Sequence, residues 1–202
     1  MSGIPVLVEM AGLDILIVGG GALAARRVEK LLAAGARVRV VALTFSGELD
    51  ALRDDPALSV ARRAYAADDI GGAALVIAAT NDREVNAAVA RDARRAGRLV
   101  NVGDAPDEGT ATMMATHRAG SLVVGVAAGG VPGAAARIRD AIAARFDDRY
   151  AGAIERLSLL RRTLLERGDR APWAQAADVA LGDDFCDAVE QGTLDDRMAA
   201  WR

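Results

Sequence analysis

The sequence Leu-Asp-Ile-Leu-Ile-Val-Gly-Gly-Gly-Ala-Leu-Ala, residues 13–24, places an apolar strand directly before a glycine-rich turn. Gly19 allows a sharp exit from the strand, where a side chain would clash. Gly21 lacks the Cβ that would keep a pyrophosphate away, and Ala24 is small enough for the next helix to pack closely on the sheet. A diphosphate would then meet the N–H groups at the start of that helix, near Ala22. The strand, the turn and the amphipathic segment that follows together predict a dinucleotide-binding unit.

The composition narrows the class of protein and the partners to expect. The 202 residues suffice for one α/β domain with an appendage or for two small domains. A net charge of −3 gives no overall basic character, so we expect no nucleic-acid partner. The single cysteine, Cys186, excludes an intramolecular disulfide and a multi-cysteine zinc site. Without a leader-like N-terminus or an apolar run of membrane-spanning length, we expect a soluble cytoplasmic protein with no membrane partner.

Apolar runs and helical segments alternate up to about residue 105, which predicts a parallel sheet covered by helices. After residue 105 the sequence predicts one clear strand and then mostly helices. Segment 110–117 is compatible with strand or loop. The predicted strands are 14–18, 38–43, 59–64, 74–79, 99–102 and 121–127, with a short edge segment at 4–9. The predicted helices include 23–34, which Gly35 ends, 82–96, and a final one near 184–201.

The end of the second predicted strand departs from the usual dinucleotide-binding pattern. An acidic residue there normally contacts the ribose hydroxyls, but residues 40–44 read Val-Val-Ala-Leu-Thr. Two interpretations remain. Either no dinucleotide binds, or Thr44 and backbone groups contact the ribose, which leaves the choice between NAD and NADP open. Arg37 and Arg39 alternate along the polar edge of this strand, and we do not expect them to bind a 2′-phosphate.

Polar residues also follow the next two strands, where ligands bind in open α/β sheets. Thr80 and Asn81 have side chains that can hydrogen-bond a ribose or an amide. Asp82 is predicted to cap the following helix. Residues 101–104 (Asn-Val-Gly-Asp) reach the same rim of the sheet. There Asp104 is a candidate general base, although aspartates at such positions also serve as turn caps.

Four blocks of sequence together resemble the precorrin-2 dehydrogenase/sirohydrochlorin ferrochelatase module of siroheme synthase. They occur in the family's order and spacing: Ile17-Val18-Gly-Gly-Gly21-x-x-Ala24-x-Arg26, Ala42-Leu43-Thr44, Val76-Ile77-Ala78-Ala79-Thr80-Asn81-Asp82 with Asn86, and Asn101-Val102-x-Asp104-x-Pro106. A looser likeness continues through Ser121-Leu-Val-Val-x-Val126, Gly129-Gly130 and Arg137. The resemblance covers most of the chain and is closest up to about residue 106.

The resemblance implies an α/β fold with a Rossmann-type parallel sheet (residues 1–112), a small α+β dimerisation segment (113–146) and a helical C-terminal domain (147–202). It implies a homodimer in which NAD⁺ oxidises precorrin-2 to sirohydrochlorin in siroheme or cobalamin biosynthesis, and many family members also insert Fe²⁺. Asp104 matches the family's catalytic base, and no resident metal site is implied. The implied cofactor contacts are Gly19, Gly20, Gly21, Ala22, Leu23, Ala24, Ala42, Leu43, Thr44, Thr80, Asn81, Asn101 and Val102.

The chain departs from the family in two segments, 111–115 and 127–133. In the family these segments surround the macrocycle site and the subunit interface, so an alternative stays open. In it, the chain is a non-catalytic protein that senses NAD(H) or binds a tetrapyrrole. His117 is the only histidine. An isolated imidazole is more often a surface or interface residue than a catalytic one, and we expect that of His117.

Overall fold

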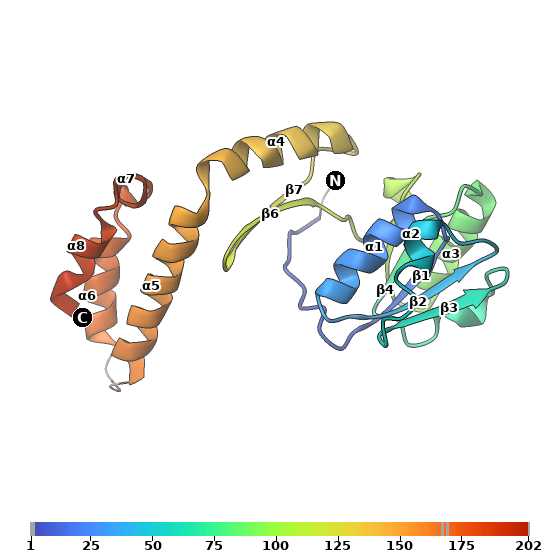
Figure 1. Cartoon of the computed structure of the whole chain (residues 1–202), viewed down its shortest axis with the longest axis horizontal. Helices are drawn as coiled ribbons and strands as arrows, with labels where there is room; N and C mark the ends of the chain where they lie inside the picture. The colour runs from blue at the N-terminus through green and yellow to red at the C-terminus, as the bar shows by residue number, and fades with distance from the viewer. Residues whose placement is uncertain (1–2, 167, 169, 202) are drawn as a thin grey trace. The chain divides into compact units, whose positions relative to one another are not determined.

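The computed structural model describes residues 3–166, 168 and 170–201. The chain divides into two compact units between Met113 and Met114 (Figure 1). Each unit has a hydrophobic core of its own.

The first unit contains a five-stranded sheet in which every strand pairing is parallel, as the alternating sequence pattern predicts. Its order is β3-β2-β1-β4-β5. The strands are β1 (Asp14–Val18), β2 (Arg37–Ala42), β3 (Leu58–Arg62), β4 (Leu75–Ala78) and β5 (Leu99–Val102). The strand order reverses at β1, between β2 and β4. Ligands of open α/β sheets bind in the crevice outside such a reversal.

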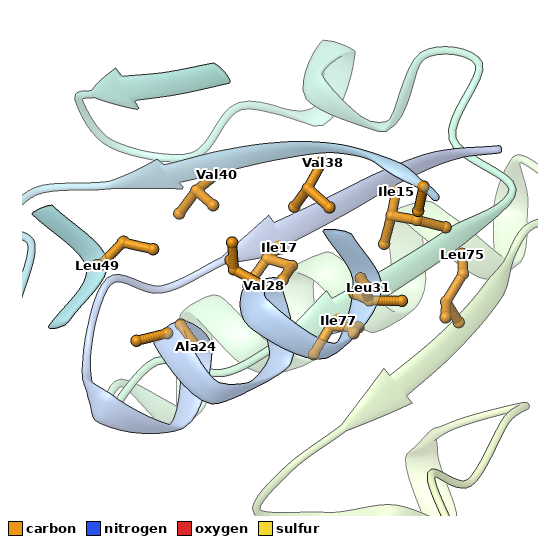
Figure 2. Close-up of a cluster of buried hydrophobic side chains, with 12 residues drawn as sticks. Ile15, Ile17, Ala24, Val28, Leu31, Val38, Val40, Leu49, Leu75 and Ile77 are labelled. Carbon is orange, nitrogen blue, oxygen red and sulfur yellow. The ribbon is translucent and has the colours of Figure 1, made fainter. Parts of the chain in front are cut away.

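Helices cover both faces of this sheet because successive side chains of a strand point to opposite sides. Ile15 and Ile17 pack with helices α1 (Ala22–Ala33) and α2 (Gly47–Asp50). Leu16 and Val18 pack with helix α3 (Arg83–Arg95) on the other face. Figure 2 shows the α1 side chains Ala24, Val28 and Leu31 directed at the sheet. Two short 3₁₀ helices, η1 (Ala67–Ile70) and η2 (Pro106–Glu108), lie in the connections.

The second unit begins with an antiparallel hairpin and continues as helices. The hairpin pairs β6 (Ala115–Ala119) with β7 (Leu122–Val126), and Gly120 turns between them with φ +57°. The helices are α4 (Pro132–Arg145), α5 (Asp148–Glu166), α6 (Ala171–Ala180), α7 (Phe185–Gln191) and α8 (Leu194–Met198), followed by the 3₁₀ turn η3 (Ala199–Trp201). The core of this unit forms around one face of α5, where Leu157, Leu160 and Leu164 are buried.

Two predicted elements are wrong. Residues 4–9 form no strand: Ile4, Val6 and Leu7 are exposed and no strand of the described chain pairs with them. Pro5 contributes to this because it has no N–H to donate to a neighbouring strand. The predicted final helix is two helices, because Gly192 ends α7 in the left-handed conformation with φ +75°. None of the described helices combines the length and apolar content that spanning a lipid bilayer requires.

Candidate functional site

The carboxyl ends of the strands bring together segments that lie far apart in the sequence. The parallel register aligns Val18 at the end of β1 with Val41 of β2 and with Ala78 at the end of β4. Ala78 is in turn aligned with Val102 at the end of β5. The segments that leave these strands therefore start at one edge of the sheet, where the sequence places the candidate ligand contacts.

The three glycines after β1 have different environments. Gly19 has φ +127°, and a Cβ built on it would lie 2.3 Å from the carbonyl oxygen of Ala79. A Cβ on Gly20 would lie 2.0 Å from the carbonyl oxygen of Thr44. Neither position can hold a side chain, because backbone from a neighbouring segment occupies the space. Gly21 has nothing within 4 Å of its Cβ position, so the turn leaves open space there.

This open space lies at the N-terminus of α1, for which Gly21 is the N-cap residue. No side chain caps the helix there, and its first turn carries no acidic residue. Unpaired N–H groups and the positive end of the helix dipole at such a position favour an anion. Open space beside an uncapped helix start fits the diphosphate of a dinucleotide.

Some residues after the glycines are buried in the core, and others lie exposed at the edge of the sheet where the strands end. Ala24 is fully buried against the sheet, which is the packing role predicted from its size. Leu23 is exposed, and its Cδ2 lies 3.5 Å from the Cβ position of Gly103, so the start of α1 approaches the loop after β5. Ala42, the last residue of β2, is half-buried, whereas Leu43 and Thr44 after it are exposed.

A buried amide links the loops after β4 and β5. Asn86 of α3 has no exposed surface. Its Oδ1 accepts hydrogen bonds from the backbone N–H and the hydroxyl of Thr80, at 3.1 and 2.7 Å. Its Nδ2 donates to the carbonyl oxygen of Thr80 at 3.0 Å and to Oδ1 of Asp104 at 2.9 Å. Thr80 and Asp104 are thus fixed relative to each other by one side chain.

The carboxylate of Asp104 remains accessible, with 39% of its side chain exposed. Nε of Arg83 lies 3.8 Å from its Oδ2, while Nη2 of the same arginine pairs with Glu108. The hydrogen bond to Glu108, with smaller contributions from nearby carboxylates including Asp104, raises the pKa of Arg83 above its usual value. Arg83 is therefore a fixed positive charge beside Asp104.

Two of the expected cofactor contacts, at the end of β5, have buried side chains. The side chain of Val102 is buried in the core under α3, which leaves only its backbone near the sheet edge. Asn101 is also buried, and its Nδ2 donates to the carbonyl oxygen of Ala111 at 3.0 Å. Asn101 therefore holds the segment after η2 against β5. Asn81, by contrast, is exposed beyond the end of β4.

The other polar residues that the sequence analysis singled out have structural partners. The prediction for Asp82 is confirmed, because its Oδ1 accepts from the N–H groups of Glu84 and Val85 at the start of α3. Arg37 pairs with Asp14 at 2.7 Å and Arg39 with Asp69 at 2.9 Å. Both arginines are thereby engaged by carboxylates, and the expectation that they do not bind a 2′-phosphate stays a prediction.

Asp69 is the centre of a charge cluster that the sequence did not reveal. Only 5% of its side chain is exposed, and it accepts from Arg63 at 2.6 and 2.7 Å and from the backbone N–H of Ala66 at 2.9 Å. Chiefly through the hydrogen bond from Arg63, these groups lower the pKa of Asp69 to about 2. The cluster connects η1 to Arg39 within β2 and to Arg63, the residue after β3.

His117 lies in the second unit, where its Nε2 is 2.5 Å from the carbonyl oxygen of Phe146, the C-cap residue of α4. This contact gives the only histidine a structural partner. No group of three or more His, Cys, Asp and Glu side chains in the described residues is arranged to hold a metal ion.

Three comparisons with known proteins agree with this architecture. Residues 6–115 match the model of the family described as "Putative NAD(P)-binding". The siroheme synthase of Nitrosomonas europaea is 34% identical to this chain over 96% of it and 45% of the relative. That of Stutzerimonas stutzeri is 34% identical over the whole chain and 42% of the relative. This chain thus spans less than half the length of these relatives.

A solved structure has the same fold over nearly the whole chain. It is described as "SirC, precorrin-2 dehydrogenase" and superimposes with a TM-score of 0.76, covering 98% of this chain and 100% of that one. The two sequences are 24% identical, so the likeness concerns the fold.

Proposed function

This chain belongs to the NAD(P)-binding family, and we propose that it oxidises precorrin-2 to sirohydrochlorin with NAD⁺, in siroheme or cobalamin synthesis. The names of its relatives and of the solved structure support the choice of reaction. The proposal rests on one observation, which is that the start of α1 lies close to the loop after β5 at the edge where the strands end. Leu23, at the start of α1, lies 3.5 Å from the Cβ position of Gly103, next to Asp104. An accessible carboxylate is thereby held beside the candidate diphosphate turn.

The proposed roles follow from what each group can bind or move. When bound, NAD⁺ accepts a hydride from the substrate. The start of α1 receives the diphosphate in the space beside Gly21, while Thr80 and the backbone after β2 contact the sugar and amide groups. The oxidation also releases a proton, which the carboxylate of Asp104 accepts. Asn86 keeps that carboxylate in place.

Fe²⁺ insertion after the oxidation would also require a proton acceptor. Metal entry displaces protons from pyrrole nitrogens, and Asp104 is the accessible carboxylate that the site offers for them. Fe²⁺ is a substrate in this proposal. We place the reaction in the cytoplasm, where the single Cys186 stays reduced.

The decisive experiment mixes the purified protein anaerobically with precorrin-2 and NAD⁺, without metal. Equal amounts of NADH and sirohydrochlorin are expected, and Fe²⁺ added afterwards tests for siroheme. Asp104→Ala is expected to bind NAD⁺ normally but to lose turnover at least a hundredfold, consistent with the usual contribution of a general base of about 10²–10⁴-fold. Asp107→Ala removes an exposed carboxylate from η2, in the same connection after β5, and serves as the control. NAD⁺ binding without any NADH would instead favour the non-catalytic binding protein.

We also propose that the protein acts as a homodimer through residues 113–146. Helix α4 buries only Ala135 within its own unit, while Val131 and Ile138 are exposed in the single chain. Ile138→Asp is expected to convert the dimer to a monomer in analytical ultracentrifugation. Val179→Asp, at an exposed position on α6, should leave the dimer intact. A monomeric wild-type protein would contradict the proposal.

A further inference from the structure

The two carboxylate oxygens of Asp104 differ in their hydrogen-bond partners. Oδ1 accepts from Nδ2 of Asn86 at 2.9 Å. Oδ2 accepts no hydrogen bond from the described part of the chain, and Nε of Arg83 lies 3.8 Å from it, beyond the range of an N–H···O bond. A lone pair that already accepts a hydrogen bond is less available to a proton. Oδ2 is therefore the oxygen of this exposed carboxylate that is open to one.

Asn86 cannot turn to serve the other oxygen. The second N–H of its Nδ2 is donated to the carbonyl oxygen of Thr80, and its Oδ1 accepts from the backbone N–H and the hydroxyl of Thr80. Both donors and both lone pairs of the amide are therefore in use. The backbone N–H of Thr80 also fixes which end of the amide is the oxygen. Asp104 is thus held with Oδ1 against a buried amide and Oδ2 free.

Glu108 determines where the guanidinium of Arg83 points. Arg83 is the first residue of α3, and its Nη2 pairs with Glu108, the last residue of η2. The backbone N–H of Glu108 donates at 3.0 Å to the carbonyl oxygen of Ala105, so the 3₁₀ turn fixes Glu108 relative to the residue that follows Asp104. Asp104 is the other carboxylate within 4 Å of Arg83 in the described residues. Without Glu108, the guanidinium has Asp104 as its nearest acceptor.

We propose that Glu108 is a positioning residue that keeps Arg83 away from Oδ2 of Asp104, and that Oδ2 accepts the proton of the oxidation. The substrate loses a hydride, which reduces NAD⁺ to NADH, and a proton, which bonds to Oδ2. The carboxyl group then releases that proton to water and is ionised again. A guanidinium bonded to Oδ2 would occupy the lone pair and stabilise the charged carboxylate, and both effects oppose proton transfer. This inference rests on the proposed function, in which Asp104 is the base.

The test compares Glu108→Ala, Arg83→Gln and the double variant. The rate of NADH formation is measured anaerobically with precorrin-2 in single-turnover mixing, which separates the chemical step from binding. Glu108→Ala is expected to slow this step about 10- to 100-fold, the usual value of a hydrogen bond to a charged group, without changing the NAD⁺ dissociation constant. The double variant is expected to react at the rate of Arg83→Gln alone, because no guanidinium then reaches Oδ2.

Two further variants separate this role from a general effect of charge. Glu108→Gln keeps an oxygen that can accept from Arg83, so it is expected to lose less activity than Glu108→Ala. Asp107→Ala removes the same charge from η2, but its carboxylate forms no ion pair with Arg83. It should slow the reaction less than about fivefold, as expected for an exposed charge.

A crystal structure of Glu108→Ala gives a readout that needs no turnover. A nitrogen of Arg83 is expected within hydrogen-bond distance of Oδ2 of Asp104. A guanidinium that stays away from Oδ2, or a wild-type rate in Glu108→Ala, would overturn the inference and leave the proposed function standing. So would a loss that the double variant does not recover, because Glu108 would then act on the loop and not through Arg83. Absence of NADH from the wild-type protein would overturn the proposed function and, with it, the role of Oδ2.

Discussion

Nδ2 of Asn86 donates a hydrogen bond to Oδ1 of Asp104 across 2.9 Å, although one residue lies in a helix and the other in the loop after β5. The same buried amide holds Thr80 after β4. The loops after β4 and β5 are therefore positioned by one residue that has no exposed surface.

Asn86→Leu removes this link while keeping a side chain of similar size. The backbone N–H and carbonyl of the half-buried Thr80 lose this hydrogen-bond partner, so the free energy of unfolding is expected to fall by about 1–3 kcal/mol. NAD⁺ affinity should fall as well, because Thr80 is no longer fixed. Urea unfolding and calorimetry measure the two effects. Arg91→Ala on the exposed face of the same helix should change stability by less than about 0.5 kcal/mol; a similar loss there would contradict the assigned role.

Alanine substitution should separate folding from binding among the three glycines. Gly20→Ala brings a Cβ to 2.0 Å from a carbonyl oxygen, so this variant is expected to be strongly destabilised. Gly21→Ala meets no atom within 4 Å and should fold like the wild type. Its methyl group, however, enters the proposed diphosphate space and should weaken NAD⁺ binding at least tenfold. Thermal unfolding and NAD⁺ titration distinguish the two variants, and wild-type affinity in Gly21→Ala would place the diphosphate elsewhere.

Asp69 is expected to give the first unit an acid-sensitive source of stability. Its pKa in the folded protein is about 2, below the usual 3.8. Its contribution is therefore complete above pH 3.8 and is lost as the pH falls through 2. The shift corresponds to about 2 kcal/mol. Asp69→Asn should lose that amount at neutral pH and show a weaker further decline in acid. Asp68→Asn, at an exposed neighbour, is the control; equal acid sensitivity of wild type and Asp69→Asn would refute this account.

Both tyrosines should resist ionisation in the folded protein. Burial and a hydrogen bond to Asp92 raise the pKa of Tyr65, and burial and a hydrogen bond to Glu190 raise the pKa of Tyr150. The unfolded chain loses these protons near the usual pKa of about 10, so their contribution to stability declines as the pH rises above that value. In a spectrophotometric titration, tyrosinate absorbance should appear only together with unfolding. A native protein that titrates normally near pH 10 would disprove the expected shifts.

The regular part of the first unit was predictable because its signals are local. The apolar residues of β1, the glycine after it and the capping by Asp82 each depend on a few neighbouring residues. The parallel sheet follows from the alternation of such segments. The helix–helix break at Gly192 was missed because one glycine is compatible with both a helix interior and a helix end until its φ is known.

The interactions that depend on distant segments were not predictable from one sequence. Gly20 is constrained by the carbonyl of Thr44, which belongs to the loop after another strand. Asp69 meets Arg39 only because η1 returns to the side of β2. Asn101 donates its amide N–H to the carbonyl oxygen of Ala111, in a segment that folds back against β5. In each case the partner is fixed by the tertiary fold, and neither residue type nor spacing identifies it.

The strand order has a consequence for the synthesis of the protein on the ribosome. β1 is made first among the strands, but one of its two neighbours in the sheet is β4. A nascent chain that ends before Leu75 therefore holds β1 with one open backbone edge and with Ile17 lacking Ile77 beside it. Such unpaired edges invite association with other chains. We therefore expect the first unit to be open to misassembly until β4 emerges and pairs with β1.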